Sequence, residues 1–249
     1  MSALKVIAGN WKMHQGPRAT RAFFERFDLE GARSEGGGEA KEGPGEALAQ
    51  ADGSPGATEG VKLLIFPPQL SLLAALEARP DTPIIGIGAQ NIHWETEGAY
   101  TGEISAEMVA EAGASHVLVG HSERRHIFGE TDDEAARKVR AALRAGLTPV
   151  LCVGETLEER KAGRVEEVVL RQLDVVLDGM DPTAELLVAY EPVWAIGTGE
   201  TATPEDASAA HGTLRHRLRE ALGEVRGDRC ALLYGGSVKP ENALELLRA

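Results

Sequence analysis

The sequence predicts an α/β fold in which helices cover a parallel sheet. Seven short apolar runs rich in valine and isoleucine recur along the 249 residues, and runs of this kind are typical of strands buried on both faces. An amphipathic stretch with a charged face follows each run, as in consecutive βαβ units. We expect strands over residues 4–9, 61–66, 84–88, 116–120, 149–153, 186–190 and 230–234.

Several helix starts are marked by residues that favour the first turn. Pro17 suits the first position of a helix, and Phe23 and Phe27 then lie one turn apart on one face. The acidic run 132–134 precedes a helical stretch, where carboxylates complement the helix dipole. Thr203 is a predicted N-cap. The strand–helix alternation therefore extends to the C-terminal part of the chain.

The number of units does not by itself decide the architecture. The length fits one large domain over residues 1–249. A closed (β/α)₈ barrel needs eight strand–helix units, whereas an open, doubly wound sheet accepts the seven that we find.

Residues 31–60 differ from the rest of the chain. They hold nine of the 29 glycines and two prolines, and their only large aliphatic residue is Leu48. Such a stretch buries too little apolar surface to offset its ordering entropy. We expect a flexible insertion between the first helix and the second predicted strand, at the pole opposite the active site. A partner-binding segment is the alternative.

The composition limits the classes of partner that we expect. The net charge of −13 argues against a general nucleic-acid surface. No run reaches the roughly 18–20 apolar residues of a membrane span, and no secretory signal is visible. Cys152 and Cys230 lie in apolar runs and are expected to be reduced core residues, which fits a cytoplasmic setting. The histidines match no zinc-ligand spacing, so we expect no metal.

Polar residues and glycines gather directly after four of the predicted strands. In α/β folds the carboxyl ends of parallel strands meet at the edge where sites form. One lysine, one histidine, one glutamate and a glycine pair should converge there. They are Lys12, His121, Glu191 and Gly235-Gly236.

Sequence blocks around these residues identify a family. In chain order, and outside residues 31–60, they read GNWKM (9–13), GAQN (88–91), GAYTGE (98–103), VGHSERR (119–125), LCVGE (151–155), AYEPVWAIGTG (189–199) and YGGSV (234–238). With these blocks the sequence resembles the triosephosphate isomerase family. The block at 189–199 is specific by itself, whereas a lone Gly-Thr-Gly is weak support.

The resemblance implies a (β/α)₈ barrel, known as the TIM barrel. It also implies an intramolecular isomerase that interconverts dihydroxyacetone phosphate and D-glyceraldehyde 3-phosphate by proton transfer through an enediolate. Such an enzyme uses no cofactor and serves glycolysis and gluconeogenesis. Another phosphosugar isomerase or epimerase on the same fold is a weaker reading.

The resemblance also assigns roles to residues at the strand ends. Glu191 is the expected base and His121 the expected electrophile for the substrate oxygens. Lys12 supplies positive charge, and Asn10 binds substrate and positions Lys12. Glu123 is a supporting anchor for Lys12.

The phosphate and the partner subunit are assigned in the same way. Residues 192–199 resemble a mobile lid. The backbone of Gly197, with Ser237 and the turn Gly235-Gly236, is expected to bind the phosphate. Residues 90–103 resemble a loop that reaches into a second subunit, so a homodimer is implied.

One departure from the family pattern concerns the C-terminus. The family continues with an eighth strand and helix, whereas this sequence stops at Ala249, within or just after the seventh helix. We expect either that residues beyond Ala249 exist in the native product or that the barrel stays open. An open barrel exposes two strand edges. A catalytically dead barrel with a binding role is the alternative in a different class.

Overall fold

The computed structural model describes residues 5–27, 46–50, 61–196, 202–236 and 238. In this part of the chain, strands close into a barrel in the order β1-β2-β8-β7-β6-β5-β4-β3. Their bounds are β1 Lys5–Asn10, β2 Glu46–Gln50, β3 Val61–Phe66, β4 Ile85–Ala89, β5 His116–Val119, β6 Thr148–Val153, β7 Leu187–Tyr190 and β8 Leu232–Tyr234. Apart from the two pairings of β2, all neighbouring strands in the barrel run parallel. The seven predicted parallel strands are confirmed.

Strand β2 corrects two expectations. It lies within 31–60 and pairs antiparallel with both β1 and β8, so it occupies the gap that seven parallel strands would leave open. The barrel is therefore closed, and no edge remains between β1 and β8. Glu46 pairs with Asn10, so the insertion reaches the C-terminal end of β1 rather than staying at the opposite pole. The other residues of 31–60 lie outside the described part, and their flexibility remains a prediction.

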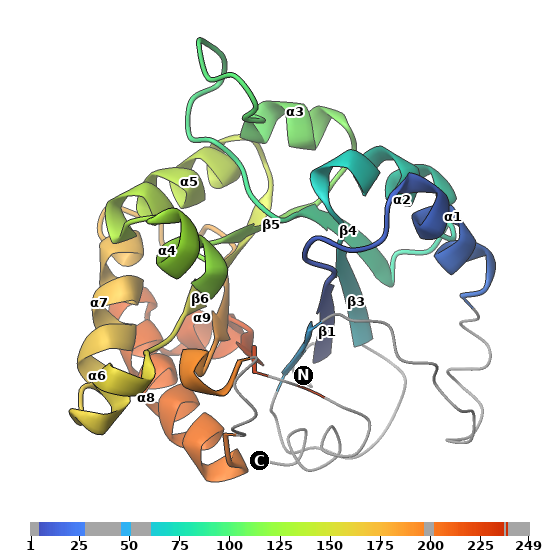
Figure 1. Ribbon diagram of the computed structural model, residues 1–249. Coiled ribbons are helices and arrows are strands. Elements are labelled where there is room, and N and C mark those ends of the chain that lie inside the picture. The colour runs from blue at the N-terminus through green and yellow to red at the C-terminus, as the bar shows by residue number, and fades with distance from the viewer. Residues whose placement is uncertain (1–4, 28–45, 51–60, 197–201, 237, 239–249) are drawn as a thin grey trace.

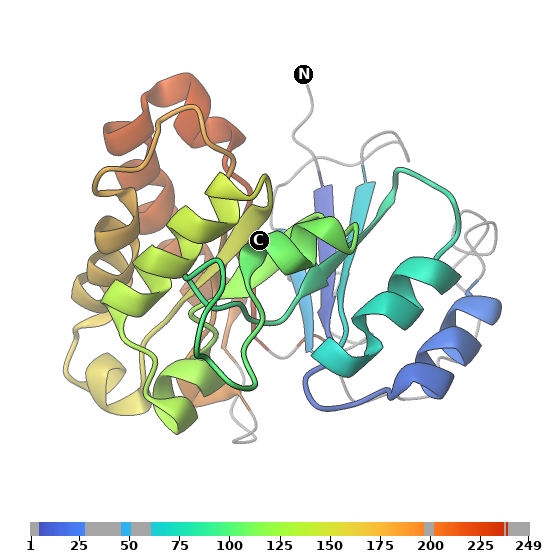
Figure 2. The same ribbon diagram turned by 90° about the horizontal axis from the view of Figure 1, so that it is seen from above.

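Helices form an arc around the strands (Figure 1), and a view from above shows α1 and α2 on one side of β1 and β3 and the later helices on the other (Figure 2). Their bounds are α1 Pro17–Glu25, α2 Leu72–Ala78, α3 Ala106–Glu111, α4 Ser122–Phe128, α5 Asp132–Arg144, α6 Leu157–Lys161, α7 Val165–Leu177, α8 Pro204–Leu222 and α9 Glu224–Arg229.

The predicted helix starts are confirmed. Pro17 opens α1, and the rings of Phe23 and Phe27 lie 5.4 Å apart between centroids. Asp132 begins α5, and Thr203 caps α8 by accepting from the Asp206 backbone N–H. The caps of α5 and α8 satisfy backbone N–H groups that the first helical turn leaves without partners, whereas Pro17 has no N–H that needs one.

Apolar side chains form two cores. The strands point one set of side chains into the barrel, including Val6, Leu64 and Leu118. The larger set lies between strands and helices, as alternate residues of a strand face opposite sides. Both cysteines are buried free thiols, as predicted.

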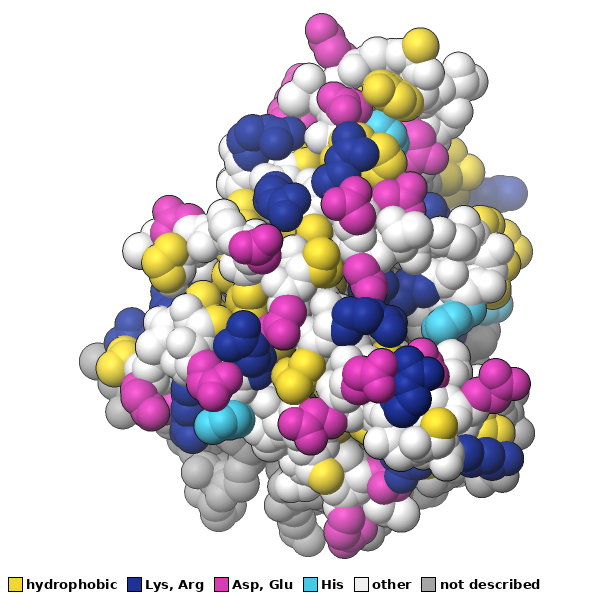
Figure 3. Space-filling view, turned by 90° about the vertical axis from the view of Figure 1, so that its left-hand side faces the viewer, with side chains coloured by type: hydrophobic (Ala, Val, Ile, Leu, Met, Phe, Trp, Pro, Cys, Tyr) yellow, Lys and Arg dark blue, Asp and Glu magenta, His cyan; other side chains and the backbone are white. Residues whose placement is uncertain are grey.

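On the face seen in Figure 3, basic and acidic side chains are interspersed with one another rather than gathered by sign. Surface ion pairs such as Arg171 with Asp132 and Arg217 with Asp174 join neighbouring helices. Within the described residues, no helix has both the length and the apolar character needed to cross a membrane.

Candidate active site

His121 stands where β5 gives way to α4, and it caps that helix with its ring. The backbone N–H of Glu123 donates to His121 Nδ1 at 3.2 Å. A nitrogen that accepts a hydrogen bond carries no proton, so the ring is the neutral tautomer with its proton on Nε2. The helix N-terminus also disfavours an imidazolium. His121 therefore presents an N–H donor to the interior of the site.

Glu191 follows β7 directly and lies against His121. Its Oε1 is 3.0 Å from His121 Nε2, and its Oε2 accepts from the Ser122 backbone N–H at 2.8 Å. The residue is 1% exposed. The backbone at Glu191 packs tightly against the loop after β6, because a Cβ on Gly154 of that loop would overlap the Glu191 carbonyl. Glycine at 154 therefore lets the β6 and β7 ends approach closely enough to hold the carboxylate in place.

Lys12 reaches the same region from the end of β1. Its backbone has a φ of +47°, which is rare for a residue with a side chain, and its N–H donates to Asn10 Oδ1 at 3.0 Å. Gln90 donates through Nε2 to the Lys12 carbonyl at 2.9 Å. The Lys12 ammonium pairs with Glu123 Oε1 at 2.8 Å. Asn10 and Glu123 thus both contact Lys12, and their roles as its anchors remain a prediction.

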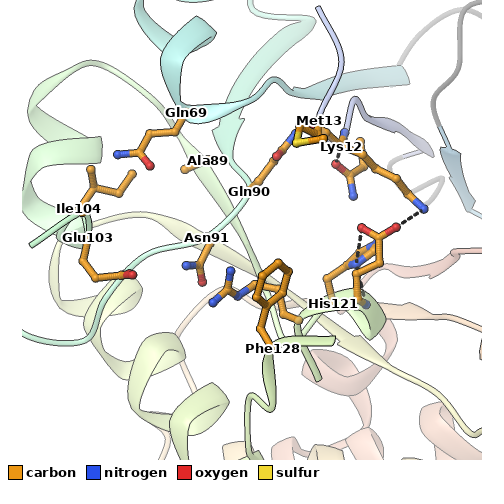
Figure 4. A pocket seen from close by; sticks show the side chains of 14 residues that line it. Lys12, Met13, Gln69, Ala89, Gln90, Asn91, Glu103, Ile104, His121 and Phe128 are labelled. Carbon is orange, nitrogen blue, oxygen red and sulfur yellow. Dashed lines mark hydrogen bonds and ion pairs between the residues drawn. The ribbon is translucent and has the colours of Figure 1, made fainter. Parts of the chain in front are cut away.

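A cavity of about 390 Å³ opens beside Lys12 and His121 (Figure 4), whereas the buried Glu191 lies behind His121 and does not line it. Asn10, Lys12 and His121 line one part of it, and the loop after β4 closes the other side with Gln90 and Glu103. Figure 4 shows Lys12 and His121 on the same side of this space. The cavity suits a small polar substrate.

A buried carboxylate holds the segment that follows Glu191. Glu155 Oε1 accepts from Trp194 Nε1 at 2.8 Å and from the Tyr190 hydroxyl at 3.1 Å. Arg160 lies 3.4 Å from the same oxygen and stacks on Trp194 at 4.4 Å from the ring centroid. Burial raises the pKa of Glu155, although these donors oppose the shift. The first residues of the predicted lid are thereby tied to the barrel.

The glycine turn after β8 lies beside β7. The Gly235 N–H donates to the Tyr190 carbonyl at 2.7 Å. A Cβ on Gly236 would overlap the Tyr234 ring, so a side chain is excluded there. Two other predicted phosphate-binding residues, Gly197 and Ser237, lie outside the described residues.

Three contributors were missed as site residues. Gln90 positions the Lys12 carbonyl, the Ser122 N–H binds the Glu191 carboxylate, and Glu155 anchors Trp194. An acid at the end of an apolar strand is the signal that marks Glu155, whereas a backbone N–H leaves none in the sequence. Across the described residues, no group of three or more His, Cys, Asp or Glu side chains is arranged to hold a metal ion.

A barrel of parallel strands that brings a buried carboxylate, a neutral imidazole and a lysine to the carboxyl ends of its strands defines an enzyme that moves protons on a small substrate. Comparison with known proteins identifies the family. The family model described as triosephosphate isomerase matches residues 38–249. The chain belongs to the triosephosphate isomerase family.

Individual relatives agree along most of the chain. A triosephosphate isomerase of Alkalilimnicola ehrlichii is 46% identical over 242 residues, covering 97% of this chain and 86% of the relative. One from Solibacter usitatus is 43% identical over 244 residues, covering 97% of this chain and 88% of the relative. One from Thermus thermophilus is 41% identical over 253 residues, covering 97% and 87% respectively.

Proposed function

We propose that the chain is an active triosephosphate isomerase that interconverts dihydroxyacetone phosphate and D-glyceraldehyde 3-phosphate. The observation that carries this proposal is the 3.0 Å contact between Glu191 Oε1 and His121 Nε2, beside the cavity that Lys12 lines. A base and a hydrogen-bond donor held this close serve the two neighbouring carbons of one small substrate.

The reaction needs one proton removed from the carbon beside a carbonyl and one returned to the next carbon. Glu191 takes the first proton as the carbonyl oxygen gains charge. His121 donates its Nε2–H to that oxygen, and the Lys12 ammonium stabilises the enediolate. Glu191 then returns the proton to the neighbouring carbon, so no external oxidant or reductant enters the balance.

The phosphate of the substrate is proposed to bind at the β8 end of the site. Gly236 is proposed to offer its backbone N–H at a turn where a side chain is excluded, and Gly235, whose own N–H donates to the Tyr190 carbonyl, is proposed to shape that turn. Gly197 and Ser237 are proposed to add donors. Asn10 is proposed to contact the substrate from β1. Residues 192–199 are proposed to close over the bound substrate and exclude water.

A homodimer is proposed through residues 90–103. This loop borders the cavity at Glu103 and exposes Tyr100, and Met13, which lines the same cavity from the segment after β1, is also exposed. Apolar side chains left in solvent beside a site are typical of an interface. We also propose a cytoplasmic location, which the two reduced cysteines favour.

A coupled assay of glyceraldehyde 3-phosphate isomerisation tests the proposed activity. We expect turnover from the 249-residue chain and a loss of at least about 100-fold in kcat for Glu191→Gln, since a positioned general base contributes that much. Glu166→Gln makes the same chemical change on the exposed side of α7 and should leave kcat unchanged. A folded chain without turnover, or faster turnover of a different phosphosugar, would favour one of the two alternative readings.

A further inference from the structure

A polar side chain interrupts the buried face of α7. Of the buried residues in this helix, Val168, Val169, Leu173 and Val176 are apolar, whereas Gln172 carries an amide. Gln172 is 4% exposed. Burying an amide costs free energy unless its donors and its acceptor find hydrogen-bond partners, and an apolar side chain of similar size would avoid that cost. An amide at this position is therefore explained by the groups that it binds.

The Gln172 amide binds both backbone groups of Gly154. The Gly154 N–H donates to Gln172 Oε1 at 2.8 Å, and Gln172 Nε2 donates to the Gly154 carbonyl at 3.2 Å. Gly154 is buried and lies one residue past Val153, the last residue of β6 that pairs with β7. Buried backbone groups beyond the end of a strand ladder need other partners. Gln172 therefore fixes two successive peptide units, and it does so from a helix that packs against β6.

Gly154 in turn lies against the main chain of the proposed base. The Glu191 N–H donates to the Val153 carbonyl at 2.7 Å. The Glu191 carbonyl is so close to Gly154 that a Cβ on the glycine would overlap it. Val153 and Gly154 thus contact the Glu191 backbone at its N–H and at its carbonyl. The Gln172 amide is separated from the backbone of Glu191 by a single residue.

The position of this backbone determines where the Glu191 carboxylate lies. Its two oxygens have separate partners, His121 Nε2 at 3.0 Å and the Ser122 N–H at 2.8 Å. A shift of the main chain would move both oxygens away from these partners and from the reacting carbons of a substrate. A displacement of about 1 Å in a catalytic group can lower the rate about 100-fold. Proton transfer by Glu191 therefore depends on contacts that fix its main chain.

We propose that Gln172 is a positioning residue for the isomerisation and that it acts on Glu191 through Gly154. The proposal rests on the proposed function of Glu191 as the base. Gln172 lies outside the lining of the cavity, so it does not contact substrate. Its amide fixes Gly154, and Gly154 fixes the main chain from which the carboxylate extends. Loss of the amide should therefore slow proton transfer without weakening substrate binding.

Steady-state kinetics of Gln172→Met test the catalytic part of this proposal. Methionine keeps the unbranched shape of glutamine but makes neither hydrogen bond to Gly154. We expect kcat to fall at least about tenfold and KM to stay within about twofold, because the substrate contacts are unchanged. Val176→Ala is the matched control, since it removes packing one turn further along the same buried face. Both variants should lower the melting temperature, but Val176→Ala should retain full kcat.

Gln172→Glu tests whether the pair of hydrogen bonds is what matters. Burial favours the neutral form of the introduced carboxyl at about pH 6. That form offers one donor and one acceptor on a side chain of the same length as glutamine. At this pH, kcat of Gln172→Glu should therefore lie closer to that of the unmodified chain than to that of Gln172→Met.

Amide hydrogen exchange, followed by NMR, tests the positioning without any turnover. In Gln172→Met the Glu191 N–H should exchange at least about tenfold faster than in the unmodified chain, because its bond to Val153 opens locally more often. The Val188 N–H, which donates to the Ala231 carbonyl near the start of β7, is the internal reference and should accelerate by a much smaller factor. Equal acceleration at both amides would indicate general destabilisation of β7 and would overturn the proposal.

The kinetic results separate failure of this proposal from failure of the proposed function. An active unmodified chain whose kcat is undiminished in folded Gln172→Met would overturn the positioning role alone. An equal loss of kcat in Val176→Ala, or no recovery in Gln172→Glu, would overturn it as well. An unmodified chain without turnover would contradict the isomerase function and, with it, the catalytic part of the proposal, while hydrogen exchange would still decide whether Gln172 fixes the Glu191 backbone.

Discussion

The barrel has two unlike regions, and they meet at the active site. The arc β5-β6-β7 is built from parallel strands that follow one another in the chain, and its carboxyl ends hold His121, Glu155 and Glu191. The seam between β1 and β8 is filled by β2, an antiparallel strand from the middle of a glycine-rich segment. The proposed base Glu191 and its neighbour His121 lie on the arc, whereas Lys12, Asn10 and the Gly235-Gly236 turn border the seam.

The two regions are held in place by different kinds of interaction. Side chains of the arc are positioned by local devices, such as the His121 cap on α4 and the close approach of Gly154 to Glu191. The seam depends on pairing between segments that are distant in sequence. Bringing such segments together costs loop-closure entropy before any hydrogen bond between them forms. Damage to the arc should therefore remove chemistry without unfolding the chain, and damage to the seam should first lower stability.

The largest expected effect concerns the arc. His121→Gln removes the imidazole that faces Glu191, and we expect kcat to fall by about 100-fold or more because the oxyanion loses its donor geometry. Steady-state kinetics with an unchanged melting temperature would fit the comparison. His126→Gln, at an exposed position of the same helix, is the matched control and should retain full kcat. A similar loss of kcat in both variants would show that the activity depends on the integrity of α4 rather than on the His121 ring.

The next effect tests the border of the two regions. His211 on α8 donates through Nε2 to the Leu233 carbonyl of β8, and burial lowers its pKa from 6.5 to about 4. Below pH 6.5 the unfolded chain therefore binds a proton on His211, whereas the folded chain binds that proton only near pH 4. The stability contributed at pH 7 is lost as the pH falls through this window, by about 3 kcal/mol.

Denaturant titrations at several pH values measure this contribution. The stability gap between the unmodified chain and His211→Gln should narrow from pH 7 to pH 4. Ser208→Ala, exposed on the same helix, changes no titratable group and should show a constant gap. A His211→Gln gap independent of pH would contradict the buried neutral histidine.

A smaller effect is expected at the seam. Ala49 pairs with Ile7 of β1 and with Tyr234 of β8, so its N–H lies in a ladder between two strands. Ala49→Pro removes that donor and should lower the free energy of unfolding by about 1–3 kcal/mol. Ala49→Gly keeps the N–H and should cost less than half as much. Equal stability of the proline variant and the unmodified chain would mean that β2 does not support the barrel in solution.

The smallest effect concerns the anchor of the proposed lid. Trp194→Phe keeps an aromatic ring over Arg160 but removes the N–H that donates to Glu155. One hydrogen bond to a charged group is lost, so kcat should change by no more than about tenfold. Stopped-flow or steady-state kinetics measure this effect. A loss of kcat as large as that of His121→Gln would mean that Trp194 contributes to the proton-transfer step and does not act only as an anchor of the proposed lid.

The arc could be predicted from the sequence because each of its elements is marked by residues that are close together in the chain. Continuous apolar runs, Thr203 as a cap and the strand-end positions of His121 and Glu191 each depend on neighbours in the chain. The closure by Glu46–Gln50 was not predicted, since a five-residue stretch with Leu48 as its only large aliphatic residue becomes a strand only when two distant edges need a partner. The Ser122 N–H was missed for a related reason: a backbone donor leaves no pattern in the sequence.

The central claim is that Glu191 moves a proton between neighbouring substrate carbons while His121 holds the oxygens. Conversion of dihydroxyacetone phosphate in D₂O, followed by proton NMR, tests it most directly. The unmodified chain should place solvent deuterium on the carbon next to the carbonyl during turnover, and Glu191→Gln should incorporate none above the buffer rate. Isomerisation with undiminished deuterium incorporation by Glu191→Gln would contradict the account.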